Sequence, residues 1–225
     1  MTTSLPISLA AEPVFYLGAF PVTNAFLTSV ILSLIVAILL LFFPRKLSYI
    51  PTNVQNGLEW VYEQMMGLVN SVVGDQKLSR EVLPLISTFF LFIILHNWLG
   101  LLPGFGAIGF REIHDGHEVF VPLLRGSNSD INQTLALSLV TVTALQYYGF
   151  KYNGKSYLKK FFNFKNPITV FVGFLELISD LVKILSFTFR LYGNIFAGEV
   201  LLIVISAFVP YIAPIPFLAL EIFAG

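Results

Sequence analysis

Five charged residues stand within one long apolar stretch of the chain, residues 171–202. A charged side chain at the centre of a bilayer costs at least about 2.5–3.5 kcal/mol, so such groups usually face a protein interior or a wet cavity. Arginine stays charged at any working pH, whereas a glutamate in a low-dielectric setting can exchange a proton near pH 7. Arg190 with nearby carboxylates therefore predicts a proton path, and the competing interpretation is a buried polar cluster that only fixes helix packing.

Helical spacing places most of these polar groups on one face. At 100° per residue, a single polar stripe is formed by Glu176, Lys183, Ser186, Arg190 and Asn194. Glu199 follows Arg190 by nine residues, which puts it half a turn away and about 13 Å along the axis. Arg190 and Glu199 cannot form a simple ion pair, so each needs compensation from water, another helix or another chain.

The composition indicates that the bilayer is the main solvent. The chain has 225 residues, of which 56% are hydrophobic and only 12% are charged, and its mean hydropathy is +0.80. A soluble enzyme and a disordered chain are excluded by these values. Thirteen basic and thirteen acidic residues leave no net charge that would attract nucleic acid. Cysteine is absent, which excludes disulfides and thiolate metal sites.

Uncharged stretches predict where the chain crosses the membrane. A span needs about 20 mostly apolar residues, and we predict three, at 20–43, 82–102 and 131–150. Residues 166–225 form a longer apolar region with charges, which we expect to fold as a helical hairpin that carries the proton path. The predicted fold class is an all-α membrane protein, with the whole of 1–225 as a single membrane domain.

The basic residues predict the orientation. Arg45 and Lys46 follow the first span, and five lysines fall in the segment 151–165 that follows the third. The positive-inside rule puts the segment after span 1 and residues 151–165 in the cytoplasm. The N-terminal tail, residues 1–19, and the loop 103–130 then lie outside.

Residues 53–73 have a different pattern. Apolar side chains recur there at helical spacing, while polar ones fall mostly elsewhere. An amphipathic helix on the cytoplasmic membrane surface is one interpretation. A helix packed against other protein is equally compatible with the pattern.

Four motifs occur along the chain in the same order as in a known family. They are NWLGLLP at 97–103, SDINQTL at 129–135, the polar run 176–186 and the sequence FRLYGNIFAGE at 189–199. Together they resemble subunit a of F-type ATP synthases, and most of all its bacterial members. The resemblance covers almost the whole chain.

The resemblance implies a set of partners and a location. Subunit a sits beside a rotating ring of c subunits, and it assembles with the peripheral stalk subunit b and the remaining ATP synthase subunits. It is multi-pass in the bacterial inner membrane, in contact with lipid, and it conducts protons without being an enzyme by itself or binding a cofactor or metal. The family folds its last two long helices nearly flat in the membrane.

The resemblance also implies roles for individual residues. Arg190 would face the ring, keep the passing carboxylate ionised and block a proton short-circuit between two half-channels. Asn194 and Glu199 would belong to the outer half-channel, where Glu221 of the return helix would exchange protons with Glu199. The outer entrance would be lined by Asn97, Asp130 and Asn132, and the cytoplasmic exit by Glu176 and Lys183 with Ser186 on the same stripe.

One departure from the family concerns the return segment. Family members continue well beyond the position of Gly225 and contribute a channel glutamine there. We therefore expect an incomplete return helix and an incomplete outer half-channel.

Two other functions remain compatible with the residues. A proton-coupled membrane transporter is the main alternative, although no internal repeat is visible. A membrane hydrolase would have to use Ser87 or Ser186 with His96. The two histidines of the loop sequence HDGH at 114–117 have metal-ligand types, but in an exterior loop they are expected to be solvated.

Overall fold

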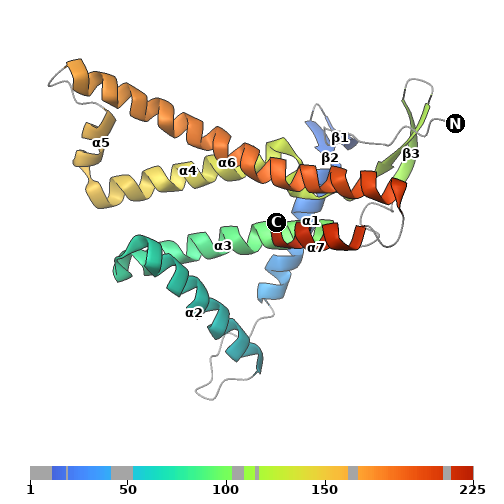
Figure 1. Cartoon of the computed structure of the whole chain (residues 1–225), viewed down its shortest axis with the longest axis horizontal. Coiled ribbons are helices and arrows are strands. Elements are labelled where there is room, and N and C mark those ends of the chain that lie inside the picture. Colours follow the sequence, from blue (N-terminus) through green and yellow to red (C-terminus); the bar gives the residue numbers. More distant parts are fainter. Residues whose placement is uncertain are drawn as a thin grey trace. The chain divides into compact units, whose positions relative to one another are not determined.

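The computed structural model describes residues 12–18, 20–41, 53–102, 109–114, 117–161, 167–209 and 214–224. Most of them are helical, as Figure 1 shows. The α-helices are α1 (Asn24–Leu41), α2 (Asn53–Val73), α3 (Gln76–Gly100), α4 (Ile131–Asn153), α5 (Lys155–Phe161), α6 (Pro167–Phe208) and α7 (Pro214–Ala224). A short 3-10 turn, η1 (Ser127–Ser129), precedes α4.

Two antiparallel β-hairpins interrupt the helical pattern. Strand β1 (Pro13–Leu17) pairs with β2 (Phe20–Thr23), and β3 (Gly109–His114) pairs with β4 (His117–Pro122). Gly18 turns the first hairpin with a φ of 65°, a conformation that glycine adopts without strain. The all-α fold class thus describes the long elements but misses both hairpins, because residues 1–19 and 103–130 were interpreted as a tail and a loop and residues 20–23 as the start of the first span.

The described chain divides into two compact units. One holds residues 29–96, and the other holds the described residues before 29 together with those after 96. The first contains most of α1, all of α2 and most of α3. In it, the exposed apolar side chains of α2 include Trp60 and Leu68.

Helix α3 follows α2 after a tight turn. Gly74 takes a φ of 74°, and the Asp75 carboxylate accepts a hydrogen bond of 2.8 Å from the backbone N–H of Lys77. The helix begins six residues before the predicted span 82–102, because a helix can continue past the charges that mark a membrane surface. Its 25 residues correspond to about 37 Å, and by length and composition it is able to cross a bilayer.

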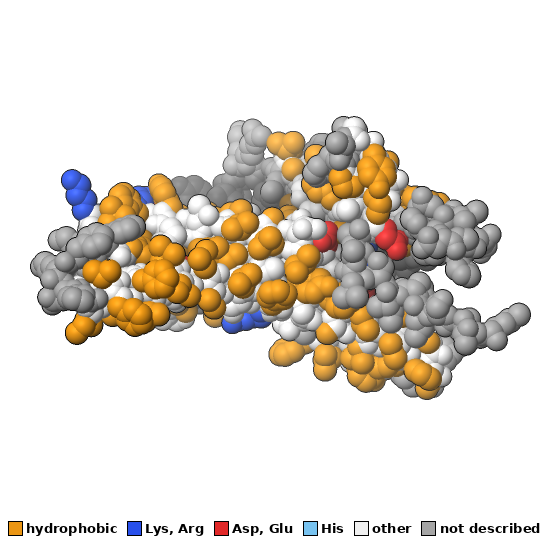
Figure 2. Space-filling model, turned by 90° about the horizontal axis from the view of Figure 1, so that it is seen from above, with side chains coloured by type: hydrophobic (Ala, Val, Ile, Leu, Met, Phe, Trp, Pro, Cys, Tyr) orange, Lys and Arg blue, Asp and Glu red, His pale blue; other side chains and the backbone are white. Residues whose placement is uncertain are grey.

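The second unit is built around α6. Helix α4 runs antiparallel to α6, with Ser138 opposite Thr188 and Gln146 opposite Asp180. Helix α5 lies between the far ends of these two helices, and α7 returns along the C-terminal half of α6, as Figure 1 shows. The described surface is rich in hydrophobic side chains, as seen in Figure 2.

Candidate functional site

Helix α6 presents Arg190 away from α4. Thr188 is buried, and its hydroxyl lies 2.6 Å from that of Ser138 on α4. Two residues along a helix turn the side chain by about 200°, so Arg190 points away from that contact and is exposed. Its guanidinium lies 5.8 Å from the ring centroid of Phe187, and among the described residues no acidic side chain pairs with it.

The predicted polar stripe divides into two halves. Ser186 and Asn194, which lie one turn before and one turn after Arg190, are exposed like the arginine itself. Glu176 and Lys183, nearer the start of α6, are half-buried. The middle of the stripe is therefore open, while its beginning is engaged by neighbouring helices.

Asp180 is the centre of a network at that engaged end. Its side chain is buried, and its two oxygens accept hydrogen bonds of 2.7 Å from Gln146 on α4 and from Lys183. The hydroxyl of Tyr157 on α5 donates a hydrogen bond of 2.7 Å to the side-chain oxygen of Gln146. Three helices are thus joined through one carboxylate. Asp180 is one of the five charged residues of 171–202, but no role was predicted for it, and neither Gln146 nor Tyr157 was predicted as a site residue.

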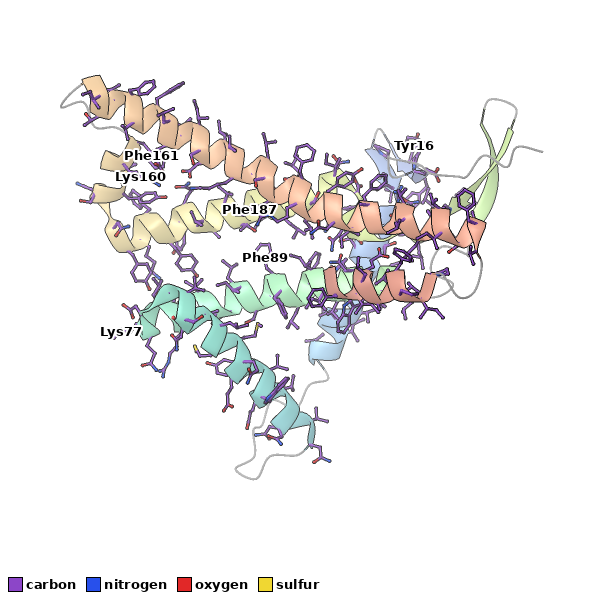
Figure 3. All side chains as sticks on the ribbon, viewed as in Figure 1. Tyr16, Lys77, Phe89, Lys160, Phe161 and Phe187 are labelled. Atoms are coloured by element: carbon purple, nitrogen blue, oxygen red, sulfur yellow. The ribbon has the colours of Figure 1, made fainter. Side chains whose placement is uncertain are left out.

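A second contact joins α5 to α6. The ammonium of Lys160 pairs with the carboxylate of Glu176, and Figure 3 labels Lys160 on the short helix. This hydrogen bond raises the pKa of Lys160 above its ordinary value. Two glycines make the close approach possible, because a Cβ on Gly149 would lie 2.7 Å from the Tyr157 ring and one on Gly173 would collide with the backbone of α5.

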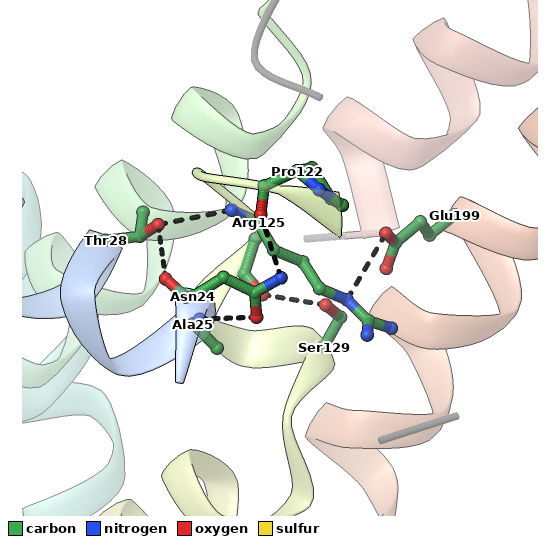
Figure 4. Close-up of polar contacts among 8 residues, drawn as sticks. Asn24, Ala25, Thr28, Pro122, Arg125, Ser129 and Glu199 are labelled. Carbon is green, nitrogen blue, oxygen red and sulfur yellow. Dashed lines mark hydrogen bonds and ion pairs between the residues drawn. The ribbon is translucent and has the colours of Figure 1, made fainter. Parts of the chain in front are cut away.

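The basic residue that pairs with Glu199 comes from outside α6. Its Oε1 lies 3.6 Å from Nε of Arg125, which stands in the connection between β4 and η1, as Figure 4 shows. The arginine side chain is only 9% exposed, and that of Glu199 is 34% exposed. Arg125 was not predicted as a site residue, although an arginine close to the start of the predicted span 131–150 was a usable signal.

Glu221 lies against the same part of α6. Its side chain is buried and rests on Gly198, where a Cβ would come within 2.9 Å of the Glu221 carboxyl carbon. Gly198 directly precedes Glu199, so the Glu221 carboxylate lies next to the part of α6 that carries the Glu199 carboxylate. In each of them Oε2 is buried without a hydrogen-bond partner among the described residues.

The three residues predicted at the outer entrance have different surroundings. Asn97 is buried, and its side-chain oxygen accepts a 2.6 Å hydrogen bond from Asn128. Asp130 is buried as the N-cap of α4, where its carboxylate accepts bonds from the backbone and the side chain of Asn132. Asn132 itself is exposed. The capping role of Asp130 was not foreseen.

Comparison with known proteins gives the family. A model of the family described as "ATP synthase A chain" matches residues 26–225. The chain is 34% identical over 181 residues to ATP synthase subunit a of Gloeobacter violaceus (strain ATCC 29082 / PCC 7421), which covers 80% of this chain and 67% of that protein. The family model's match includes α6 and α7 with all of the side chains described above. The chain therefore belongs to the ATP synthase A chain family, the non-catalytic, proton-translocating subunits of the membrane sector of ATP synthase.

Proposed function

We propose that this subunit conducts protons through two offset half-channels that are separated by Arg190, and that Arg190 faces the carboxylates of a rotating c-ring. The observation that supports this most directly is the position of Arg190. It is exposed on α6, opposite the face that α4 covers, and no described acid pairs with it.

The other charges on α6 are compensated within the chain. Glu176 pairs with Lys160, Asp180 pairs with Lys183, and Glu199 pairs with Arg125. A guanidinium at membrane depth also needs an anion or water. Because the described part of the chain supplies Arg190 with no anion, a carboxylate of a neighbouring subunit is the compensation that fits best.

The distances along α6 suit two access routes on either side of this cation. Arg190 is 14 residues after Glu176 and nine before Glu199, or about 21 Å and 13 Å along the axis. We assign the inner exit to Glu176, Lys183 and Ser186. We assign the outer route to the pair Glu199 and Glu221, with Asn194, Asn97, Asp130 and Asn132 leading to it.

The length of α6 supports a strongly inclined position in the membrane. Its 42 residues extend for about 63 Å, twice the roughly 30 Å of the hydrocarbon core. An upright helix of this length would place many of its exposed apolar side chains in water. We propose that α6 and α7 lie tilted in a bacterial inner membrane, with the N-terminus outside and the subunit b stalk alongside.

A fixed cation between the half-channels prevents leakage. One charge that crosses 100 mV releases about 2.3 kcal/mol, so each ATP requires several protons and every leaked proton lowers the yield. Arginine side chains are positively charged throughout the working pH range, and Arg190 stands between the two proposed routes. It repels a free proton, and it favours the ionised form of a carboxylate that passes it.

The test uses whole ATP synthase in membrane vesicles. Replacement R190A is expected to abolish proton-driven ATP synthesis and ATP-driven pumping while the complex still assembles. The matched control is S179A, an exposed side chain on the same helix that has no place in the proposed path. Full coupled synthesis by the R190A enzyme, at a normal content of the subunit in the membrane, would overturn the proposal.

A further inference from the structure

We infer that Arg125 is a positioning residue of the outer half-channel, which fixes the place of the Glu199 carboxylate next to Glu221. The inference rests on the proposed place of Glu199 in the proton path. It begins from the ion pair of 3.6 Å between the Arg125 guanidinium and the Glu199 carboxylate. The arginine comes from the connection before η1, far from α6 in the sequence.

Buried polar side chains fix the backbone on which Arg125 stands. Its backbone N–H donates to the hydroxyl of Thr28 at 3.2 Å, and the side-chain amide of Asn24 donates to the carbonyl of Pro122 at 3.2 Å, as Figure 4 shows. Asn24 has no exposed surface, and Thr28 is also buried. Burying such groups is unfavourable unless they are bonded, and here their bonds hold the segment that carries the arginine.

Hydrogen bonds and a close backbone contact also fix the segment that follows Arg125. The carbonyl of Gly126 accepts hydrogen bonds from the backbone and the hydroxyl of Ser129, at 3.2 Å and 2.7 Å. Gly100 passes so close that a Cβ on it would lie 3.3 Å from the Cα of Gly126. Arg125 therefore cannot move away from Glu199 by a simple loop displacement.

Arg125 determines where the Glu199 carboxylate lies. Glu199 pairs with Arg125, and Glu221 is buried against Gly198, the residue that precedes Glu199 on α6. The ion pair therefore keeps Glu199 next to the second carboxylate of the proposed outer route. Proton transfer along this route depends on both groups being in place, because a small misplacement of a reacting group slows a reaction sharply.

The experiment compares four variants of the intact ATP synthase in inverted membrane vesicles, R125Q, R125K, E199Q and the double variant R125Q/E199Q. ATP-driven proton pumping is measured per mole of subunit in the membrane. We expect R125Q and E199Q each to lose about tenfold or more, because a misplaced group impairs proton transfer as an absent one does. R125K should keep most of the activity, and the double variant should be no worse than E199Q. The control R80Q changes an exposed arginine of α3 and should have no effect.

The outcomes separate the inference from the proposed function. Unchanged pumping by E199Q would remove Glu199 from the proton path, which contradicts the proposed function. Impaired E199Q with unchanged R125Q would leave the path intact and overturn only the role of Arg125. Losses that multiply in the double variant, or R125K as poor as R125Q, would show a separate structural role and also overturn it. If R125Q does not accumulate, R125M takes its place, and absence of both from the membrane overturns the inference in favour of a role in assembly.

Discussion

The two ends of α6 differ in the ion pairs that their acidic residues form. At the end near Asp180, two acids face two bases, because Glu176 pairs with Lys160 and Asp180 with Lys183. At the end near Glu199, Arg125 pairs with Glu199, while Glu221 is buried against Gly198 and forms no ion pair with a described residue. Each acid at the first end thus has a basic partner, whereas the second end holds a buried acid without one among the described residues.

Hydrogen bonding shows the same contrast. Both oxygens of Asp180 accept bonds, from Gln146 and from Lys183, and the network continues to Tyr157. By comparison, Glu199 and Glu221 each keep a buried oxygen for which the described residues provide no donor. A saturated network resists change because every rearrangement breaks a bond, whereas an unsaturated carboxylate can bind a proton or a water. We conclude that the Asp180 end fixes helices in place and the Glu199 end is suited to proton exchange.

The largest effect is expected from breaking the saturated network. Replacement D180A leaves Lys183 without its partner and the Gln146 amide without an acceptor, so the free energy of unfolding should fall by about 2–4 kcal/mol. Partial exposure of Lys183 keeps the loss below that of a fully buried pair. Thermal denaturation of the detergent-solubilised subunit measures it, with S179A as the neighbouring control. An unchanged denaturation temperature for D180A would contradict a clamping role.

A smaller change tests the other end. Replacement G198A would place a methyl group against the Glu221 carboxyl, and such overpacking typically costs about 1–3 kcal/mol. Because the displaced group belongs to the proposed path, coupled proton pumping should fall more than stability does. The control is G67A in α2, where a Cβ meets nothing within 4 Å. If G198A and G67A pump alike, the contact between Gly198 and Glu221 has no part in conduction.

The sequence predicted what depends on spacing along one helix. At 100° per residue, Arg190 and Glu199 fall on opposite faces of α6 and cannot form an ion pair with each other. In the structure, Glu199 pairs with Arg125 instead. The exposure of Arg190 and the burial of Thr188 could not be predicted, because they depend on which face α4 covers. The distribution of hydrophobic residues gives little help with this choice, since lipid and protein contacts both favour apolar side chains.

Contacts between distant segments account for most of what was missed. Arg125 meets Glu199, and Gln146 meets Asp180, across separations of 74 and 34 residues. No local period encodes such pairs. The hairpin β3–β4 is a different case, because the run VFV in HEVFVP combines β-branched and aromatic residues, which favour strands. A run of this length is too short to be read as a membrane span.

The smallest effect concerns the pair of Lys160 and Glu176, and it is visible through pH. The pKa of Lys160 is raised in the folded protein, so the lysine binds its proton more tightly when folded than when unfolded. The stability it adds is complete below its ordinary value of 10.5 and is lost as the pH rises through the higher folded value. Since both side chains are about one-third exposed, solvent screening limits the contribution to a few tenths of a kcal/mol.

Replacement K160M should remove this contribution. Above pH 10.5, the stability of K160M should therefore fall less steeply with rising pH than that of the parent protein. The control K155M changes an exposed lysine of the same short helix and should leave the alkaline profile unaltered. Denaturation temperatures measured from pH 8 to 12 at low and high salt provide the comparison, and salt should reduce the difference between K160M and the parent. If all three proteins show the same dependence of denaturation temperature on pH at low salt, the ion pair between Lys160 and Glu176 adds no stability. The network of Asp180 would then join the helices at this end of α6 by itself.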